Sequence, residues 1–345
     1  MSGEVKHFGL HRIDSTELRV IADAEAGVLP VIGVEEEVIR RYIEQGAWIH
    51  QYVTLFILQD MGPLTRQLQS VTELPPGGAE ALGQRPVVNV YDLADPSGCQ
   101  IFINWEAMVR EGYWNEPSIV RALLAHEHAH PFAECAATAA SRRLFIEIAA
   151  DNLSEALERV PGAEDRAGEL RRILGSMAHK LCADAPREAI TNEFAIRAGF
   201  ADAMMYLDSR NVANAAAALA GREQLRAGLQ DESDRGRMTR AAAAAILVVG
   251  DLHSYLDLAI ETASFYRAGE DTCARELENT LRTQVFAHLR PGVADAFTAL
   301  RDRYVELERD VSPAELVTWA EGVAGVLADA LATEGVSAAF RVYTA

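Results

Sequence analysis

Two histidines and a glutamate at fixed spacing are the residues of this sequence that most clearly suggest chemistry. They form the segment His126–His130, which reads HEHAH and satisfies the pattern H-E-x-x-H. On a helix, residues four apart lie on one face, so the imidazoles of His126 and His130 can bind one zinc ion. Glu127 is displaced around the helix and can face a water molecule on that ion. The segment therefore predicts metal-assisted hydrolysis with one Zn2+ per chain and Glu127 as the general base.

The sequence around the motif predicts the elements that such a site requires. A helix is predicted from Pro117 to about His130, because proline suits a helix start and the proline after the motif disfavours helical conformation before it. Two short β-strands separated by a turn are predicted upstream, at Pro86–Asp92 and Cys99–Asn104. His128 points away from the face of the two candidate ligands, so we expect it to support the ligands or to lie at the surface.

Zinc needs a third protein ligand, and two later glutamates are candidates. Alanines occupy the positions at which the extended metzincin pattern would continue. Glu193 is preferred, because its neighbours on a helical wheel are apolar and a carboxylate there is costly unless it is paired or bound to a metal. The ordinary explanation of Glu193 is an ion pair with Arg197, one turn further on. Glu147 is the second candidate; on a predicted helix over residues 136–160 it falls on an acidic face typical of solvent exposure.

The remaining parts of a hydrolytic site are predicted from residue type and position. Tyr206, His253 and Tyr255 are candidates to stabilise an oxyanion. The strand Cys99–Asn104 is expected to hold an extended peptide by edge pairing. The predicted activity is that of a zinc metallopeptidase, acting on a peptide or protein substrate or on an amide in a small molecule.

The stretch Cys99–His130 resembles the gluzincin zinc metallopeptidases, and within them the branch of HtpX-like and CAAX-prenyl proteases. The shared features are an edge strand, an acidic residue before the active helix and the core L-a-H-E-x-x-H, which reads LAHEHAH here. The resemblance implies the two histidines as ligands, the glutamate beside them as the base, and a glutamate in a later helix as the third ligand. The segment from Glu193 to Gly199 matches that later helix in part, with Arg197 where the family has aspartate. The transmembrane helices of the family are absent, which implies a soluble relative.

Two other functions fit parts of the sequence. Glu127-x-x-His130 is also the E-x-x-H element of carboxylate-bridged di-iron helical oxidases, for which Glu44 and Glu147 offer further carboxylates. The second E-x-x-H of the sequence, Glu4–His7, lies in a stretch with no helical pattern. The helical region Met238–Thr333 instead fits a catalytically degenerate, protease-like chain that binds a partner.

The composition is that of an acidic globular protein. The chain has 345 residues, and its 32 basic and 51 acidic residues give a formal net charge of −19. Such a surface repels phosphate backbones, so nucleic acid is not expected as a partner. Four scattered cysteines without a C-x-x-C pair argue against a cysteine-based zinc site and a disulfide framework. The N-terminus lacks the apolar stretch of a signal peptide, and the longest apolar run, Ala241–Gly250, is too short to span a membrane, so a cytoplasmic protein is predicted.

Helical patterns dominate the rest of the chain, and the predicted fold class is α+β, mainly α. We expect an N-terminal mainly helical region at 1–80, a zincin-like catalytic domain with a small sheet at 81–229, and a helical C-terminal region at 238–345. A loop at Leu74–Gly78 and the polar segment Gln230–Arg237 mark the boundaries. The C-terminal helices are candidates for a homo-oligomer contact. Helices are predicted at Val34–Asp60, 136–160, 164–182, 187–208, 212–229, 238–266, 271–289, 292–309 and 313–333.

Overall fold

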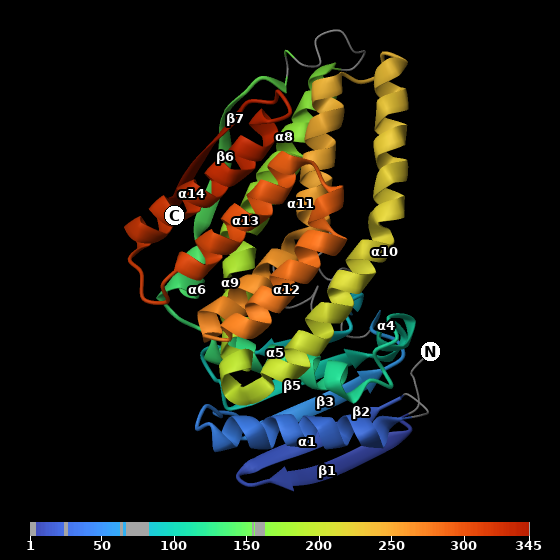
Figure 1. The fold of residues 1–345 in the computed structure, drawn as a ribbon. Coiled ribbons are helices and arrows are strands. Elements are labelled where there is room, and N and C mark those ends of the chain that lie inside the picture. The colour runs from blue at the N-terminus through green and yellow to red at the C-terminus, as the bar shows by residue number, and fades with distance from the viewer. Residues whose placement is uncertain are drawn as a thin grey trace. The chain divides into compact units, whose positions relative to one another are not determined.

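The computed structural model describes residues 5–23, 27–62, 65–66, 83–153, 155 and 163–344, and the chain divides into two units. Unit 1 comprises the residues up to Phe132 together with Phe194–Leu207, and unit 2 comprises Ala133–Glu193 and the residues from Asp208 onward. The predicted fold class is confirmed, because a small sheet is combined with many helices and a helical C-terminal region (Figure 1). The regions 1–80, 81–229 and 238–345 are bounded differently from these units and stay a prediction. The predicted loop Leu74–Gly78 lies outside the described residues.

Unit 1 is built on a five-stranded mixed sheet in the order β1-β2-β3-β5-β4. The three central strands β2, β3 and β5 run parallel, whereas β1 pairs with β2 and β4 pairs with β5 in antiparallel fashion. Both predicted strands upstream of the motif are therefore confirmed, as β4 and β5. The strands are β1 (His7–Ile13), β2 (Thr16–Ala22), β3 (Tyr52–Leu58), β4 (Val87–Tyr91) and β5 (Gly98–Asn104).

The register of the sheet separates its two faces. Cys99 lies opposite Val53 and Ile101 lies opposite Leu55, and these side chains are buried. Alternate residues point to the opposite face, where the rings of Phe56 and Phe102 stack with centroids 4.6 Å apart. Helices α1, α4 and α5 of the described chain belong to this unit, and α1 lies along the sheet (Figure 1). These are α1 (Val28–Glu44), α4 (Trp105–Arg110) and α5 (Pro117–Phe132).

The predicted helix Val34–Asp60 is wrong in its second half. Helix α1 ends at Glu44, and Gly46 follows with a φ of 66°, a left-handed conformation that suits glycine. The segment Tyr52–Leu58 then forms β3, with alternate residues fully buried. Its β-branched and aromatic residues suit a strand, and β2 and β5 pair with it on both sides.

Unit 2 consists mainly of long helices, which confirms the predicted helical C-terminal region. The break predicted between helices 187–208 and 212–229 is wrong, because α10 is continuous from Ala201 to Asp234. In Figure 1 α11, α12, α13 and α14 run side by side, and β6 pairs with β7 in a separate two-stranded sheet. The segment Phe194–Leu207 belongs to unit 1 and includes the last residues of α9 and the first residues of α10. The elements are α6 (Ala136–Ser141), β6 (Leu144–Asp151), α8 (Ala163–His179), α9 (Ala185–Ala195), α10 (Ala201–Asp234), α11 (Arg240–Ala268), α12 (Asp271–Gln284), α13 (Pro291–Glu306), α14 (Pro313–Ala332) and β7 (Ala338–Thr344).

The predicted helix over residues 136–160 is also wrong. Residues Ala136–Ser141 form the short helix α6, and the sequence LFIEIAAD that follows is strand β6, antiparallel to β7. Burial alternates along its first residues with the period of a strand, and β7 supplies the pairing that stabilises it. Glu147 therefore lies on a strand and not on a helix.

Helix α11 is the one described helix that is long and apolar enough to cross a membrane by length and composition. Within its most apolar window, 72% of the residues are buried inside the structure. The core helix of a soluble protein has the same character, so this helix is weak evidence for a span.

Candidate metal centre

Helix α5 carries the HEHAH segment and brings its two predicted ligands together. The ring centroids of His126 and His130 are 4.8 Å apart and their planes cross at 81°. Both side chains are half-buried. The donor set fits zinc, because two imidazoles on one helix face can converge on one ion.

The helix continues to Phe132, two residues beyond its predicted end. Pro131 has no N–H, so the carbonyl of Glu127 loses the donor that a helix normally supplies four residues later. The side-chain amide of Asn89 donates to that carbonyl over 2.8 Å. This substitute donor explains how a helix with an internal proline continues here.

Asn89 also holds the predicted base. Its backbone N–H donates to Oε2 of Glu127 over 3.0 Å, and the same oxygen is 3.9 Å from Nε2 of His130. Glu127 is 9% exposed, so its carboxylate is largely buried and accepts a hydrogen bond there. The geometry keeps the carboxylate beside one of the two candidate ligands.

The strand beside Glu127 is β4, which forms one edge of the sheet. The prediction that Cys99–Asn104 is the edge strand is wrong, because that strand is β5 and lies between β3 and β4. The N–H of Asn104 bonds to the carbonyl of Pro86 over 2.9 Å, which fixes the alternation along β4. The main-chain groups of Val87, Asn89 and Tyr91 therefore point away from β5.

His128 is fully buried, which excludes the surface role expected for it as one alternative. Its Nε2 lies 2.8 Å from Oε1 of Glu35 on α1. Burial alone would lower the pKa of His128, but the Glu35 carboxylate raises that pKa to about 10. Nearby His50 has no such carboxylate, and burial lowers its pKa to about 4.

Glu193, the preferred third ligand, is buried in unit 2 in an ion pair with Arg267. Its Oε2 accepts from Nε of Arg267 over 2.9 Å and lies 2.8 Å from Nη2. Arg267 also donates to the carbonyl of Tyr304 over 2.8 Å. The buried carboxylate of Glu193 is therefore charge-paired with an arginine from helix α11. Its role as a zinc ligand stays a prediction.

Glu147, the other candidate ligand, is exposed on strand β6 of unit 2. Its carboxylate lies 3.7 Å from Nη1 of Arg341, and both side chains are more than half exposed. The i+4 residue, Asp151, forms an ion pair with Arg171 at 2.7 Å. These contacts fit the solvent-facing interpretation of Glu147 better than a ligand role.

The three oxyanion candidates lie in different surroundings. Tyr206 is exposed in unit 1, and its hydroxyl donates to Glu116 over 3.3 Å. His253 is exposed on α11, whereas Tyr255 is buried on the same helix in unit 2. None of these contacts assigns an oxyanion role.

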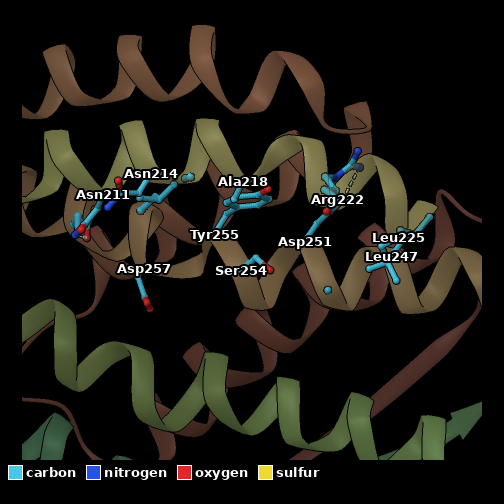
Figure 2. A pocket seen from close by; sticks show the side chains of 15 residues that line it. Asn211, Asn214, Ala218, Arg222, Leu225, Leu247, Asp251, Ser254, Tyr255 and Asp257 are labelled. Atoms are coloured by element: carbon cyan, nitrogen blue, oxygen red, sulfur yellow. Dashed lines mark hydrogen bonds and ion pairs between the residues drawn. The ribbon is translucent and has the colours of Figure 1, made fainter. Parts of the chain in front are cut away.

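Unit 2 contains a pocket of about 510 Å³ between α10 and α11 (Figure 2). At one end Arg222 makes two bonds to the Asp251 carboxylate, at 2.6 and 2.8 Å, and both side chains are buried. At the other end Asn211 donates to Glu261 over 2.8 Å. The described residues that line it include no histidine or cysteine, so this pocket offers carboxylates, amides and an arginine but no imidazole or thiol ligands.

Comparison with known proteins adds no family to this geometry. No protein-family model, no curated protein and no solved structure matches the chain.

Proposed function

We propose that this chain is a zinc-dependent metallohydrolase of the H-E-x-x-H type, and in particular a peptidase. The observation that carries the proposal is the grouping on α5 of two imidazoles at 4.8 Å and a buried carboxylate 3.9 Å from one of them. The resemblance of the segment to gluzincin metallopeptidases supports the same activity.

His126 and His130 would hold the ion, and Glu193 is the proposed third ligand. A bound zinc ion supplies a Lewis acid and lowers the pKa of water. Glu127 takes the proton of the attacking water and returns it to the leaving amine. The backbone N–H of Asn89 orients the Glu127 carboxylate for this role.

Strand β4 is the proposed binding strand for the substrate. Its outward main-chain groups at Val87 and Tyr91 can pair with an extended peptide, as in strand addition at a sheet edge. A small-molecule amide would not need this edge, so a preference for peptides of several residues supports peptidase over amidase activity.

The test is zinc content per chain in protein purified without a histidine tag, together with cleavage of a mixed peptide library followed by mass spectrometry. His130→Ala is expected to lower the zinc content by one ion per chain, whereas His288→Ala, which removes an exposed histidine in unit 2, leaves it unchanged. Glu127→Gln is expected to retain the zinc and lose cleavage. Unchanged zinc in His130→Ala, or cleavage by Glu127→Gln, overturns the proposal.

The third ligand is tested by three matched carboxylate variants. Loss of one zinc in Glu193→Gln but not in Glu147→Gln supports Glu193, and the reverse moves the ligand to Glu147. Glu188→Gln covers the other carboxylate of helix α9. Two irons per chain would instead support a di-iron oxidase. That alternative expects a second E-x-x-H on a helix, whereas the second one in this sequence ends at His7, which lies on strand β1.

A further inference from the structure

Unit 1 buries a second group of ligand-type side chains, distinct from the pair His126 and His130. The group consists of His50, Cys99 and His128, which are 1%, 4% and 0% exposed. One nitrogen of each imidazole and the cysteine sulfur lie within 4.8 Å of one another. The three residues come from the segment before β3, from β5 and from α5, so only the fold brings them together.

Each imidazole in this group has one nitrogen bonded and one nitrogen without a partner. Nδ1 of His50 lies 2.6 Å from the carbonyl of Pro96, and Nε2 of His128 lies 2.8 Å from the Glu35 carboxylate. A carbonyl and a carboxylate only accept hydrogen bonds, so both of these nitrogens carry protons. Nε2 of His50 and Nδ1 of His128 are buried and have no hydrogen-bond partner.

This pattern is characteristic of histidines that bind metals. A ligating imidazole usually donates its other N–H to a carboxylate or a backbone carbonyl, which fixes the tautomer and the ring orientation. The His128–Glu35 contact by itself would be an ordinary buried pair. Cys99 interacts with His128 as well, but neither contact explains why Nε2 of His50 lies buried and unpaired beside the thiol, which is costly in a protein interior.

We propose that Nε2 of His50, Nδ1 of His128 and Sγ of Cys99 bind a zinc-type divalent ion. Tetrahedral zinc with Zn–N of about 2.0–2.1 Å and Zn–S of about 2.3 Å places its ligand atoms roughly 3.3–3.6 Å apart, which is compatible with three atoms that lie within 4.8 Å of one another. Glu35 is not a ligand, because it bonds the ring nitrogen that points away from the ion. The fourth position falls to a small ligand such as water.

The charge of the buried group selects a divalent ion. The Cys99 thiolate and the Glu35 carboxylate contribute two negative charges, which one divalent cation neutralises. A monovalent copper ion would leave a net negative charge in the protein interior, which is unfavourable. Thiolate and imidazole together are also ligands that zinc prefers over magnesium or calcium.

The surroundings suit a structural ion. The rings of Trp48 and Phe132 lie 5.1 and 5.5 Å from that of His50, so aromatic groups cover the site. Thr16 holds this segment in place, since its hydroxyl donates to the His50 carbonyl over 3.0 Å and accepts from Trp48 over 2.8 Å. The ion would tie α5, with the HEHAH segment, to β5. This proposal does not depend on the catalytic function of that segment.

The test is titration of the metal-free full-length chain with Co2+, followed by near-ultraviolet absorption. A thiolate bound to Co2+ gives a charge-transfer band, which nitrogen and oxygen ligands alone cannot give. The wild type is expected to develop this band with a final intensity that corresponds to one thiolate-bound Co2+ per chain. Cys99→Ser is expected to abolish the band, whereas Cys182→Ser, which alters a buried thiol in unit 2, retains it. Glu35→Gln keeps an acceptor for His128 but loses the charge, and it is expected to weaken Co2+ binding about 10–100-fold.

The wild-type spectrum decides the question even if a variant fails to fold. No thiolate band at saturating Co2+ overturns the proposal, as does a band that persists in folded Cys99→Ser. His130→Ala separates the two proposals, because it removes a ligand of the HEHAH centre and leaves the thiolate band unchanged. If the thiolate band appears but His130→Ala leaves the metal content unchanged, the result supports the site at His50, Cys99 and His128. It counts against the proposed metallohydrolase function.

Discussion

The hydrogen bond between the Asn89 side chain and the Glu127 carbonyl should be energetically coupled to Pro131, and the size of this coupling can be predicted. In the wild type the carbonyl has no helical donor at residue 131, and the Asn89 amide replaces it at 2.8 Å. Asn89→Ala removes this donor and keeps the backbone N–H that binds the Glu127 carboxylate. An unsatisfied buried carbonyl costs about 1–3 kcal/mol, which is the expected loss in the free energy of unfolding.

Pro131→Ala restores an N–H at position 131, so the helix can satisfy the Glu127 carbonyl by itself. Asn89→Ala should then cost about 1–2 kcal/mol less than it does in the wild type. Pro131→Ala changes helix propensity and unfolded-state entropy as well, but these effects cancel in the double-mutant cycle.

The cycle is measured by urea unfolding with tryptophan fluorescence. All four proteins carry Trp319→Phe, so that the remaining tryptophans, at positions 48, 105 and 114, report on unit 1. Additive effects, with a coupling below about 0.5 kcal/mol, would refute the assignment of Asn89 as the replacement donor.

Two further predictions concern the pocket in unit 2. Asp251→Ala removes the buried carboxylate from Arg222, which keeps the more exposed Glu223 at 2.8 Å, and should destabilise the protein by about 3 kcal/mol, seen as a lower Tm; a shift as small as that of an exposed ion-pair variant would contradict this. Burial, followed by the nearby Asp208 carboxylate, raises the pKa of Glu261 well above its usual value, so the folded state binds this proton more tightly than the unfolded chain. The resulting stabilisation is complete below the unfolded pKa of about 4.3 and is lost as pH rises toward the folded pKa. Glu261→Gln should flatten that decline in urea unfolding across pH, and an unchanged slope would count against it.

The elements with strong local signals could be predicted from the sequence. Helices beyond residue 163 have clear stops and caps, such as the Ser312 capping box at the start of α14. The strands β4 and β5 are short β-branched runs around a turn. The errors at Val34–Asp60 and at 136–160 concern segments whose state depends on pairing with distant strands. Tyr52–Leu58 pairs with β2 and β5, and Leu144–Asp151 pairs with β7 at the end of the chain, so no local pattern determines them.

The same distinction applies to the candidate site. His126, Glu127 and His130 could be found because they lie within one and a half turns of helix. The burial of Glu193 also agrees with its wheel position, and the buried ion pair that it forms is with Arg267 of another helix. The scattered cysteines argued against a cysteine-containing zinc site. Cys99 became a candidate ligand only through the register of β5, which turns its thiol to the face of Val53.

The four polar residues of HEHAH point in different directions, and this bears on whether the motif arose by chance. Residues 126 and 130 share a face, residue 127 is displaced by about 100° and residue 128 by about 200°. A solvated helix face would leave such residues exposed. Here Glu127 and His128 are buried, at 9% and 0% exposure, and each has a specific partner, in Asn89 and Glu35. Burial of ionisable groups is unfavourable without such partners, and here two separate elements, β4 and α1, supply them. The surrounding fold therefore holds both Glu127 and His128 in defined positions, although the pattern H-E-x-x-H does not require His128.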